Sequence, residues 1–357
     1  MTKKTLSLTL LLLSLFCSLA QDTDELVMDF EVYDPPSTLV VPEHPKTQAK
    51  FPFIDVHSHH WGMADQDLDL LTSQKDSINM GVIVNLSGRG GEEMEKMFEN
   101  VKEYAVEDRI VIFTNIDFSE IGNEGWTESA VKRLEQDVKN GAKGLKIYKS
   151  LGLRINDTSG NRVPIDDPRI GPIWDKCGEL GIPVLIHAAD PQQFWMEHDE
   201  NNERWLELKL RPRRKRSDTD PAPWDQIIAE QHRIFEKHSN TTFINAHFGW
   251  YANDLQKLDS IMQKYPNTVV EFGAVIAELG RQPRNASAFF EKYQDRILFG
   301  KDAWNPEEYY TYFRVLETDD EYFPYYKKYH AFWRMYGLDL NDEILKKIYY
   351  KNALRVI

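Results

Sequence analysis

The stretch Phe51–His60 reads FPFIDVHSHH, and the interpretation of the whole chain starts from it. Its apolar first half, Phe51–Ile54, predicts the first buried strand of a sheet. Side chains alternate between the two faces of a strand, so His57 and His59 point the same way and can converge on one cation. The stretch therefore predicts a metal site at the carboxyl end of the first strand.

From Ile54 onward, short β-branched runs alternate with amphipathic helical stretches. This alternation is typical of repeated βα units, and eight such units close into a barrel. We predict strands at residues 51–59, 81–86, 110–116, 144–148, 183–187, 242–247, 268–272 and 297–302. The expected fold is an α/β (β/α)8 TIM barrel, whose functional residues lie at the carboxyl ends of the strands.

One connection is much longer than the others. Residues 188–223 separate the fifth strand from its predicted helix, Trp224–Lys237, and include the basic run Arg211–Arg216. A loop of this length is usually functional or disordered, and here it would lie over the mouth of the barrel. The basic run is equally compatible with substrate binding and with solvated loop charges.

The amino terminus has the pattern of a secretory signal. Lys3 and Lys4 precede the apolar run Leu6–Phe16, and small residues follow at Ser18–Ala20. The run is too short to span a membrane, so we expect cleavage near Ala20 and export to the periplasm or the medium, with no transmembrane segment. We divide the chain into a signal peptide (1–20), an extended proline-rich arm (21–50) and a barrel domain (51–357).

Composition excludes some classes of partner. The formal net charge is −14 at pH 7, which argues against nucleic acid because phosphate backbones need a cationic surface. Only Cys177 remains once the signal is removed, so the mature chain cannot form an internal disulfide. Self-association into a homo-oligomer stays open.

Four histidines and one acid fall at predicted strand ends. His57 and His59 end the first strand, His187 the fifth and His247 the sixth, while Asp302 ends the eighth. Three imidazoles and one carboxylate form the ligand set of a catalytic Zn²⁺ or similar ion, with bonds of about 2.0–2.2 Å and one position left open.

These motifs resemble a known family. Asp55–His59, His187, His247 and the run Arg296–Asp302 are similar to the metal-dependent amidohydrolase superfamily. The ending Tyr350–Arg355 resembles its amidohydrolase-2 branch, which contains decarboxylases, hydratases and lactonases built on TIM barrels. The resemblance covers the predicted barrel domain.

The resemblance implies one divalent ion bound by His57, His59, His187 and Asp302. It places His247 beside the ion as an acid/base group that exchanges a proton near pH 7. Asp302 is the second candidate catalytic residue, because it could take a proton from an attacking water. Zinc is the expected metal, with Mn²⁺ or Fe²⁺ as alternatives.

Lys146 raises a second interpretation, because binuclear members of the superfamily carry a carboxylated lysine at the end of strand four. Lys146 would then bridge two ions, and His187 and His247 would bind the second one. We favour a substrate-binding or ion-paired lysine, since the branch is mostly mononuclear.

Cationic residues gather after the strands although the chain is acidic, which favours an anionic substrate. Lys301 departs from the family, which usually has a small residue there; it could bind substrate or alter metal affinity. Tryptophans that could stack on sugar rings or pack the loops recur at the same end: Trp61, Trp195, Trp250 and Trp304. The candidate substrate-binding residues are Lys146, Lys149, Arg89, Arg281, Trp250 and Lys301.

The resemblance leaves two reaction types. We favour a lyase, of dehydratase, hydratase or decarboxylase type, that acts on a carboxylate-bearing substrate such as an acidic sugar or oligosaccharide. The alternative is a metal-dependent hydrolase of a lactone, ester or amide. A binding protein on a catalytically inactive barrel is disfavoured, because all the candidate ligands are present.

Overall fold

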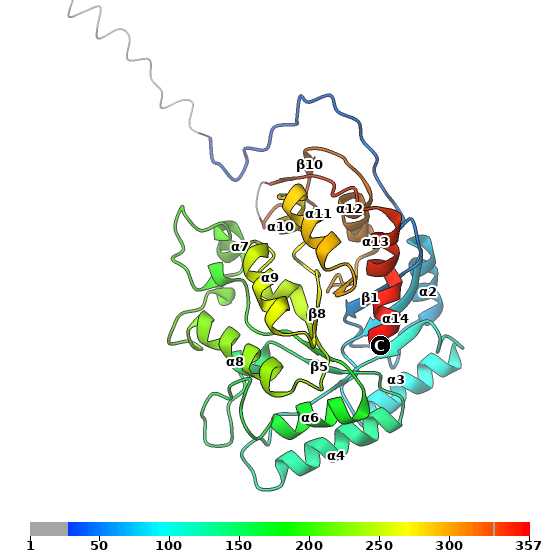
Figure 1. Cartoon of the computed structure of the whole chain (residues 1–357), viewed down its shortest axis with the longest axis vertical. Coiled ribbons are helices and arrows are strands. Elements are labelled where there is room, and N and C mark those ends of the chain that lie inside the picture. Colours follow the sequence, from blue (N-terminus) through cyan, green and yellow to red (C-terminus); the bar gives the residue numbers. More distant parts are fainter. Residues whose placement is uncertain (1–27, 331–332) are drawn as a thin grey trace, which may run out of the picture. The chain divides into compact units, whose positions relative to one another are not determined.

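A computed structural model describes residues 28–330 and 333–357 (Figure 1). The chain divides into two units, the first ending at Val40 and the second running from Val41 to Ile357. In the first unit, residues 28–40 are irregular apart from a turn in which Val32 N–H donates to the Asp29 carbonyl at 3.0 Å. The predicted signal peptide, residues 1–20, lies outside the described residues. Within the described ranges, every helix is too short or too polar to cross a membrane.

Parallel strands pair in chain order in two sheets, β1-β2-β3 and β4 through β9. The eight predicted strands are confirmed in order, the third being divided into β3 and β4. Most are shorter than predicted, while β2 keeps its length and begins one residue earlier. Their bounds are β1 (Phe53–Ser58), β2 (Met80–Asn85), β3 (Ile110–Ile112), β4 (Thr114–Asn115), β5 (Leu145–Ile147), β6 (Val184–Ile186), β7 (Phe243–Asn245), β8 (Thr268–Glu271) and β9 (Ile297–Leu298).

The two sheets are joined at both edges, by the chain itself at one edge and by backbone hydrogen bonds at the other. Only Phe113 separates β3 from β4, so these two segments occupy one strand position. At the other edge, Val56 N–H donates to the Phe299 carbonyl at 2.9 Å and Asp302 N–H to the His57 carbonyl at 2.7 Å. These bonds connect β1 to the segment that follows β9 and close eight strand positions into the predicted TIM barrel.

Helices follow the strands, and the predicted helix Trp224–Lys237 is confirmed at both ends. Most lie outside the strands (Figure 1). Their bounds are α2 (Leu68–Ser77), α3 (Glu92–Glu103), α4 (Trp126–Lys139), α5 (Ser150–Leu153), α6 (Gly171–Leu180), α8 (Trp224–Lys237), α9 (Leu255–Lys264), α10 (Ile276–Gly280), α11 (Pro283–Lys292), α12 (Pro306–Glu317), α13 (Asp342–Lys346), the π-helical turn η5 (Lys347–Lys351) and α14 (Asn352–Val356). A hairpin of β10 (Phe323–Pro324) and β11 (Arg334–Met335) follows α12.

The centre of the barrel is apolar. One buried cluster joins side chains from strands on opposite sides of the barrel, among them Val84 of β2 and Ile244 of β7. Such residues can meet only across the barrel interior, which a TIM barrel fills with branched side chains. Parallel strands covered on both faces read as nearly continuous apolar runs, which is why they were recognisable in the sequence.

The long insertion follows β6, which is the fifth strand position of the barrel, as predicted. It contains η2 (Gln192–Phe194), α7 (Trp205–Leu210) and η3 (Pro212–Arg214). A buried ion-pair network holds it: Arg204 donates to Glu207 at 3.0 Å and also pairs with Glu278 on α10. Arg214 pairs with Glu207, and Arg216 donates to Asp190 at 3.0 Å. These two members of the basic run therefore hold the insertion in place.

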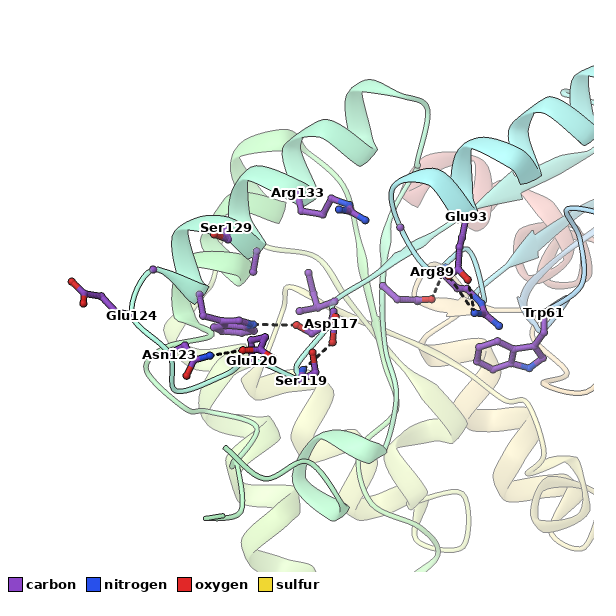
Figure 2. A pocket seen from close by; sticks show the side chains of 16 residues that line it. Trp61, Arg89, Glu93, Asp117, Ser119, Glu120, Asn123, Glu124, Ser129 and Arg133 are labelled. Atoms are coloured by element: carbon purple, nitrogen blue, oxygen red, sulfur yellow. Dashed lines mark hydrogen bonds and ion pairs between the residues drawn. The ribbon is translucent and has the colours of Figure 1, made fainter. Parts of the chain in front are cut away.

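Two cavities open at the carboxyl ends of the first strands. One of about 890 Å³ lies between the segments after β2 and β4, with Trp61 and Arg89 at one end and Glu124 at the other (Figure 2). A second, of about 450 Å³, is lined by Lys146 and Tyr148 at the end of β5.

Candidate metal centre

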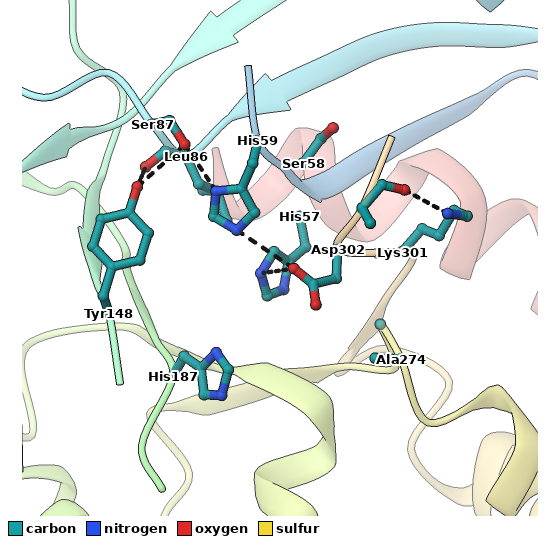
Figure 3. A network of polar contacts seen from close by, with 12 residues as sticks. His57, Ser58, His59, Leu86, Ser87, Tyr148, His187, Ala274, Lys301 and Asp302 are labelled. Atoms are coloured by element: carbon teal, nitrogen blue, oxygen red, sulfur yellow. Dashed lines mark hydrogen bonds and ion pairs between the residues drawn. The ribbon is translucent and has the colours of Figure 1, made fainter. Parts of the chain in front are cut away.

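The closing edge of the barrel brings three candidate ligands together. His57 is the penultimate residue of β1, His59 follows that strand, and Asp302 follows β9 (Figure 3). The Nε2 atoms of His57 and His59 lie 3.4 and 3.5 Å from the same Asp302 oxygen, Oδ1. An ion with bonds of about 2.1 Å at tetrahedral angles separates its ligand atoms by about 3.4 Å. The spacing of these three side chains therefore fits one metal ion.

Glu271, at the end of β8, fixes the orientation of His57. The His57 Nδ1 atom lies 2.8 Å from Glu271 Oε1, and a carboxylate only accepts, so Nδ1 carries the proton. The lone pair is then on His57 Nε2, a buried atom with no hydrogen-bond partner among the described residues. A carboxylate behind a ligand histidine is a common support of metal sites. Sequence reasoning missed this role, although Glu271 is the penultimate residue of a predicted strand, 268–272.

Glu271 also positions His247. It accepts hydrogen bonds from the backbone N–H groups of His247 at 2.8 Å and Gly273 at 2.6 Å. His247 begins a left-handed turn in η4 (Ala246–Trp250), with φ of 56° at His247 and 58° at Gly249. Left-handed backbone outside glycine is strained and persists where surrounding contacts hold it. The turn brings the imidazole beside those of the β1 histidines, with ring centres of His57 and His247 5.0 Å apart.

The proton positions on His247 and His187 follow from their partners. His247 Nδ1 donates to the Gly273 carbonyl at 2.6 Å, which leaves the lone pair on Nε2. His187 Nδ1 lies 3.2 Å from that Nε2 and donates to it. The lone pair of His187 is then on its own Nε2, which is buried without a hydrogen-bond partner in the described part of the chain. His187 thus has a ligand atom available, although it is outside the closest three-residue groups.

The charge state of the cluster suits a metal. Burial lowers the pKa of His57, His59 and His187, and it lowers that of His247 to about 4. Burial alone would raise the pKa of Asp302, but the neighbouring His57 and His59 imidazoles hold it well below its usual value. Neutral imidazoles and an ionised carboxylate are the forms that bind metal ions near pH 7.

Lys146 on β5 is a buried amine without a partner. Its Nζ has no hydrogen bond within the described residues and lies 5.5 Å from the centre of the Tyr148 ring. Burial lowers its pKa to about 8, opposed by the charge of Asp302. An unpaired buried charge is costly, which makes Lys146 a candidate for an anionic ligand.

The other predicted cations are already paired. Arg89 donates to Glu93 at 2.9 Å, Arg281 lies 3.3 Å from Glu203, and Lys149 pairs with Asp190. The predicted cationic surface is therefore largely neutralised. Whether these three side chains bind substrate stays a prediction.

Lys301 and Trp250 differ in their relation to the centre. Lys301 is buried and turns away from the imidazoles, donating to Glu308 at 2.6 Å and to the Ala303 carbonyl (Figure 3). Its expected contact with substrate has no support in this geometry, because the ammonium is enclosed by its own loop. The Trp250 ring stacks on His247 with centres 4.6 Å apart, and its N–H donates to the Ala188 carbonyl at 2.8 Å.

Comparison with known proteins identifies the family. Residues 121–357, which include His187, His247 and Asp302, match the family model described as Amidohydrolase (Amidohydro_2). The chain belongs to this amidohydrolase family. The predicted family is thereby confirmed, and the chain is an amidohydrolase-superfamily enzyme of lyase or hydrolase type. No curated protein matches the chain.

Solved structures share the fold at low identity. An uncharacterised TIM-barrel protein from Bordetella bronchiseptica has a TM-score of 0.52 and 14% identity, covering 86% of this chain and 98% of its own. A 2,6-dihydroxybenzoate decarboxylase in complex with 2,6-dihydroxybenzoate has a TM-score of 0.52 and 13% identity, with coverages of 86% and 98%. A dihydroxybenzoic acid decarboxylase from Polaromonas sp. JS666, with bound manganese and 2-nitroresorcinol, has a TM-score of 0.53 and 13% identity, with coverages of 86% and 96%. At these identities, the likeness shows the TIM-barrel fold alone.

Proposed function

We propose that this amidohydrolase is an exported, metal-dependent lyase acting on a carboxylate-bearing substrate, such as an acidic sugar or oligosaccharide. The observation that carries the proposal is the unpartnered ammonium of Lys146, buried near the cluster of neutral imidazoles. A substrate carboxylate would supply the missing partner, since a charge-assisted hydrogen bond offsets the cost of burying the amine. The solved decarboxylases of the same fold also act on carboxylates, as the bound 2,6-dihydroxybenzoate illustrates.

His57, His59, His187 and Asp302 would hold one divalent ion, which we propose to be Zn²⁺, with Mn²⁺ or Fe²⁺ as alternatives. The unpartnered Nε2 atoms of His57 and His187 support this assignment. Such an ion withdraws electron density from a carboxylate and so acidifies the neighbouring C–H bond. Lys146 acts in this scheme as an unmodified ammonium; a second ion bridged by its carbamate is the alternative.

His247 would exchange the proton in a dehydration. It is neutral at pH 7 because burial lowers its pKa to about 4. Its Nε2 lone pair accepts a hydrogen bond from His187 Nδ1 in this structure, and once substrate binding breaks that bond the lone pair can accept the proton from the carbon beside the carboxylate. The C–H electrons form the new double bond as the bond to the neighbouring hydroxyl breaks. The protonated imidazole is a strong acid in this environment, so it returns the proton to the leaving hydroxide as water.

Product mass tests the reaction type. Purified protein is incubated with uronates, lactones and aromatic acids, and bound metal is measured in the same preparation. Loss of water or carbon dioxide is expected, whereas gain of water with cleavage of a lactone, ester or amide bond would show a hydrolase and overturn the lyase assignment. Unchanged metal content in a His57→Ala/His187→Ala double variant would contradict the proposed ligand set.

Lys146→Met tests the carboxylate contact. We expect KM for the active substrate to rise about 10- to 100-fold, because a charge-assisted hydrogen bond contributes roughly 1.5–3 kcal/mol. Lys75→Met is the matched control: Lys75 is equally buried but donates to the Arg109 carbonyl. An unchanged KM in Lys146→Met, or an equal rise in Lys75→Met, would remove the basis of the proposal.

Export rests on the amino-terminal pattern of Lys3, Lys4 and Leu6–Phe16. We expect the mature protein to begin just after Ala20 and to be recovered outside the cytoplasm. Amino-terminal sequencing of the protein from fractionated cells checks both expectations, and an intact start at Met1 would contradict them.

A further inference from the structure

The cavity of about 890 Å³ lies beside the candidate metal centre. It is bounded by the segments after β1, β2 and β4 and by the start of α4, with Trp61 at one end (Figure 2). Trp61 stacks on His59 of the centre. Its volume is in the upper part of the range of roughly 300–1,000 Å³ typical of small-molecule sites. The cavity therefore has room for more than one ring.

This cavity adjoins the smaller one at the end of β5. The two share Ile116, Asp117 and Ser119 in their linings, and the smaller one is lined by Lys146 and Tyr148. We call the two adjoining cavities together the rim groove. Its inner end is lined by Lys146, whose ammonium is buried and unpartnered among the described residues.

Aromatic stacking joins the groove to the metal centre. The Trp61 ring is stacked on Tyr148 with centres 5.4 Å apart and on His59 with centres 5.8 Å apart. Trp61 is 52% exposed, unusual for so large a ring, and Arg89 lies 5.9 Å from its centre. A flat, half-exposed indole of this kind is suited to stack on a sugar ring. A ring resting there would be adjacent to His59.

The charge of the outer groove is opposite to that of its inner end. Two guanidinium groups line the outer cavity, Arg89 and Arg133, but four carboxylates do so as well: Glu93, Asp117, Glu120 and Glu124. Arg89 is neutralised by Glu93, and Arg133 lies 3.6 Å from Asp137. The outer groove thus repels anions. Its carboxylates can accept hydrogen bonds from sugar hydroxyls, and its amides and hydroxyls can both accept and donate them.

We propose that the rim groove binds neutral sugar residues attached to the acidic ring that is processed at the metal centre. The substrate class is then a uronic acid linked to neutral sugars rather than a polyuronate. This inference rests on the proposed function for the placement of the acidic ring. The acid lies toward Lys146, and the neutral neighbour stacks on Trp61.

Binding measurements test the groove independently of turnover. Calorimetric titration compares three ligands: a free uronic acid, an aldobiouronate in which that acid is linked to a neutral sugar, and the corresponding diuronate. We expect the aldobiouronate to bind about tenfold more tightly than the free acid, and the diuronate to gain nothing over the free acid. In Trp61→Ala, the affinity ratio of aldobiouronate to free acid should fall about tenfold.

Two further variants make the result specific. Trp205→Ala is the matched control, because Trp205 is a partly buried tryptophan of the insertion outside the groove lining, and it should keep the wild-type ratio. Replacing two carboxylates, Glu120→Gln with Glu124→Gln, should raise the affinity for the diuronate several-fold. Using a ratio removes any effect of Trp61 on the metal centre itself.

The outcomes separate the groove from the proposed reaction. Three results would each contradict sugar binding in the rim groove. They are absence of binding by all three ligands, equal affinities for all three, and an affinity ratio that Trp61→Ala leaves unchanged. Trp61-dependent binding without any lyase product would support sugar binding in the rim groove and refute the proposed lyase reaction. Turnover of the free acid, with no higher affinity for the aldobiouronate, would support the lyase reaction and refute sugar binding in the rim groove.

Discussion

Replacing Glu271 with Gln should weaken both the metal centre and the fold. Glu271 is fully buried, and it accepts hydrogen bonds from His57 Nδ1 at 2.8 Å, His247 N at 2.8 Å and Gly273 N at 2.6 Å. Gln keeps the shape of the side chain but removes its charge and offers one acceptor atom instead of two. At least one of the three donors therefore loses its partner.

The magnitude follows from the pKa of Glu271. Burial alone would raise it, but His57, His247 and the backbone N–H of Gly273 lower it from 4.5 to about 2. At about 1.4 kcal/mol per pKa unit, the ionised form stabilises the fold by about 3 kcal/mol at pH 7. Because the folded pKa is the lower one, this stabilisation is present above pH 4.5 and is lost as the pH falls toward 2. Glu271→Gln should lack it.

Two measurements check this prediction. Urea unfolding of metal-free protein should show a loss of about 3 kcal/mol at pH 7 that shrinks near pH 3. Chelator competition should show metal affinity lowered about 10- to 100-fold, the usual effect of losing a support behind a ligand histidine. Glu230→Gln is the control: this buried carboxylate pairs with Arg162, outside the site, so stability should fall while metal affinity holds. Wild-type metal affinity in Glu271→Gln would refute the reasoning.

Three other substitutions probe the core, the left-handed turn and the acid/base group. Phe53→Ala removes a fully buried ring whose centre lies 4.7 Å from that of Phe299, and urea unfolding should show a loss of about 3–5 kcal/mol; a loss below 1 kcal/mol would contradict this packing. Gly249→Ala adds a Cβ 2.5 Å from the Asn245 amide at φ +58°, so stability should fall by more than about 1 kcal/mol and turnover should drop, whereas wild-type stability would exclude the strain. His247→Asn should lower turnover about 10²- to 10⁴-fold in steady-state assays while metal content stays constant, and parallel loss of metal would instead make His247 a ligand.

The fold was predictable because the sequence pattern and the physics agree. Each barrel strand is buried on both faces, so it appears as a short apolar run that ends in the residue needed at the rim. His57, His187 and His247 could be placed from this pattern alone, since strand ends meet at one end of a barrel. The strand bounds were less accurate, because the last residues of a strand leave the sheet where they form the site.

The electrostatic environment was not predictable in the same way. Lys149 pairs with Asp190, and Lys301 with Glu308, through side-chain geometry that no spacing in the sequence reveals. Glu271 was equally hidden, because its role depends on a bond from β8 to β1, which pass close together only in the closed barrel. Sequence reasoning therefore located the chemical groups, but the structure was needed to show which of their charges are already neutralised.

The candidate metal centre straddles the place where the barrel's first and last strand positions meet. His57 and Asp302 face one another across that junction, and the same two residues share the backbone hydrogen bond of 2.7 Å beside it. An ion held between them would stabilise the closure, so its removal should increase amide hydrogen exchange at Val56 and Asp302 before it affects β5. Loss of the metal should therefore first increase local opening of the barrel at this junction. The protease resistance of the enzyme would then depend on the supply of metal.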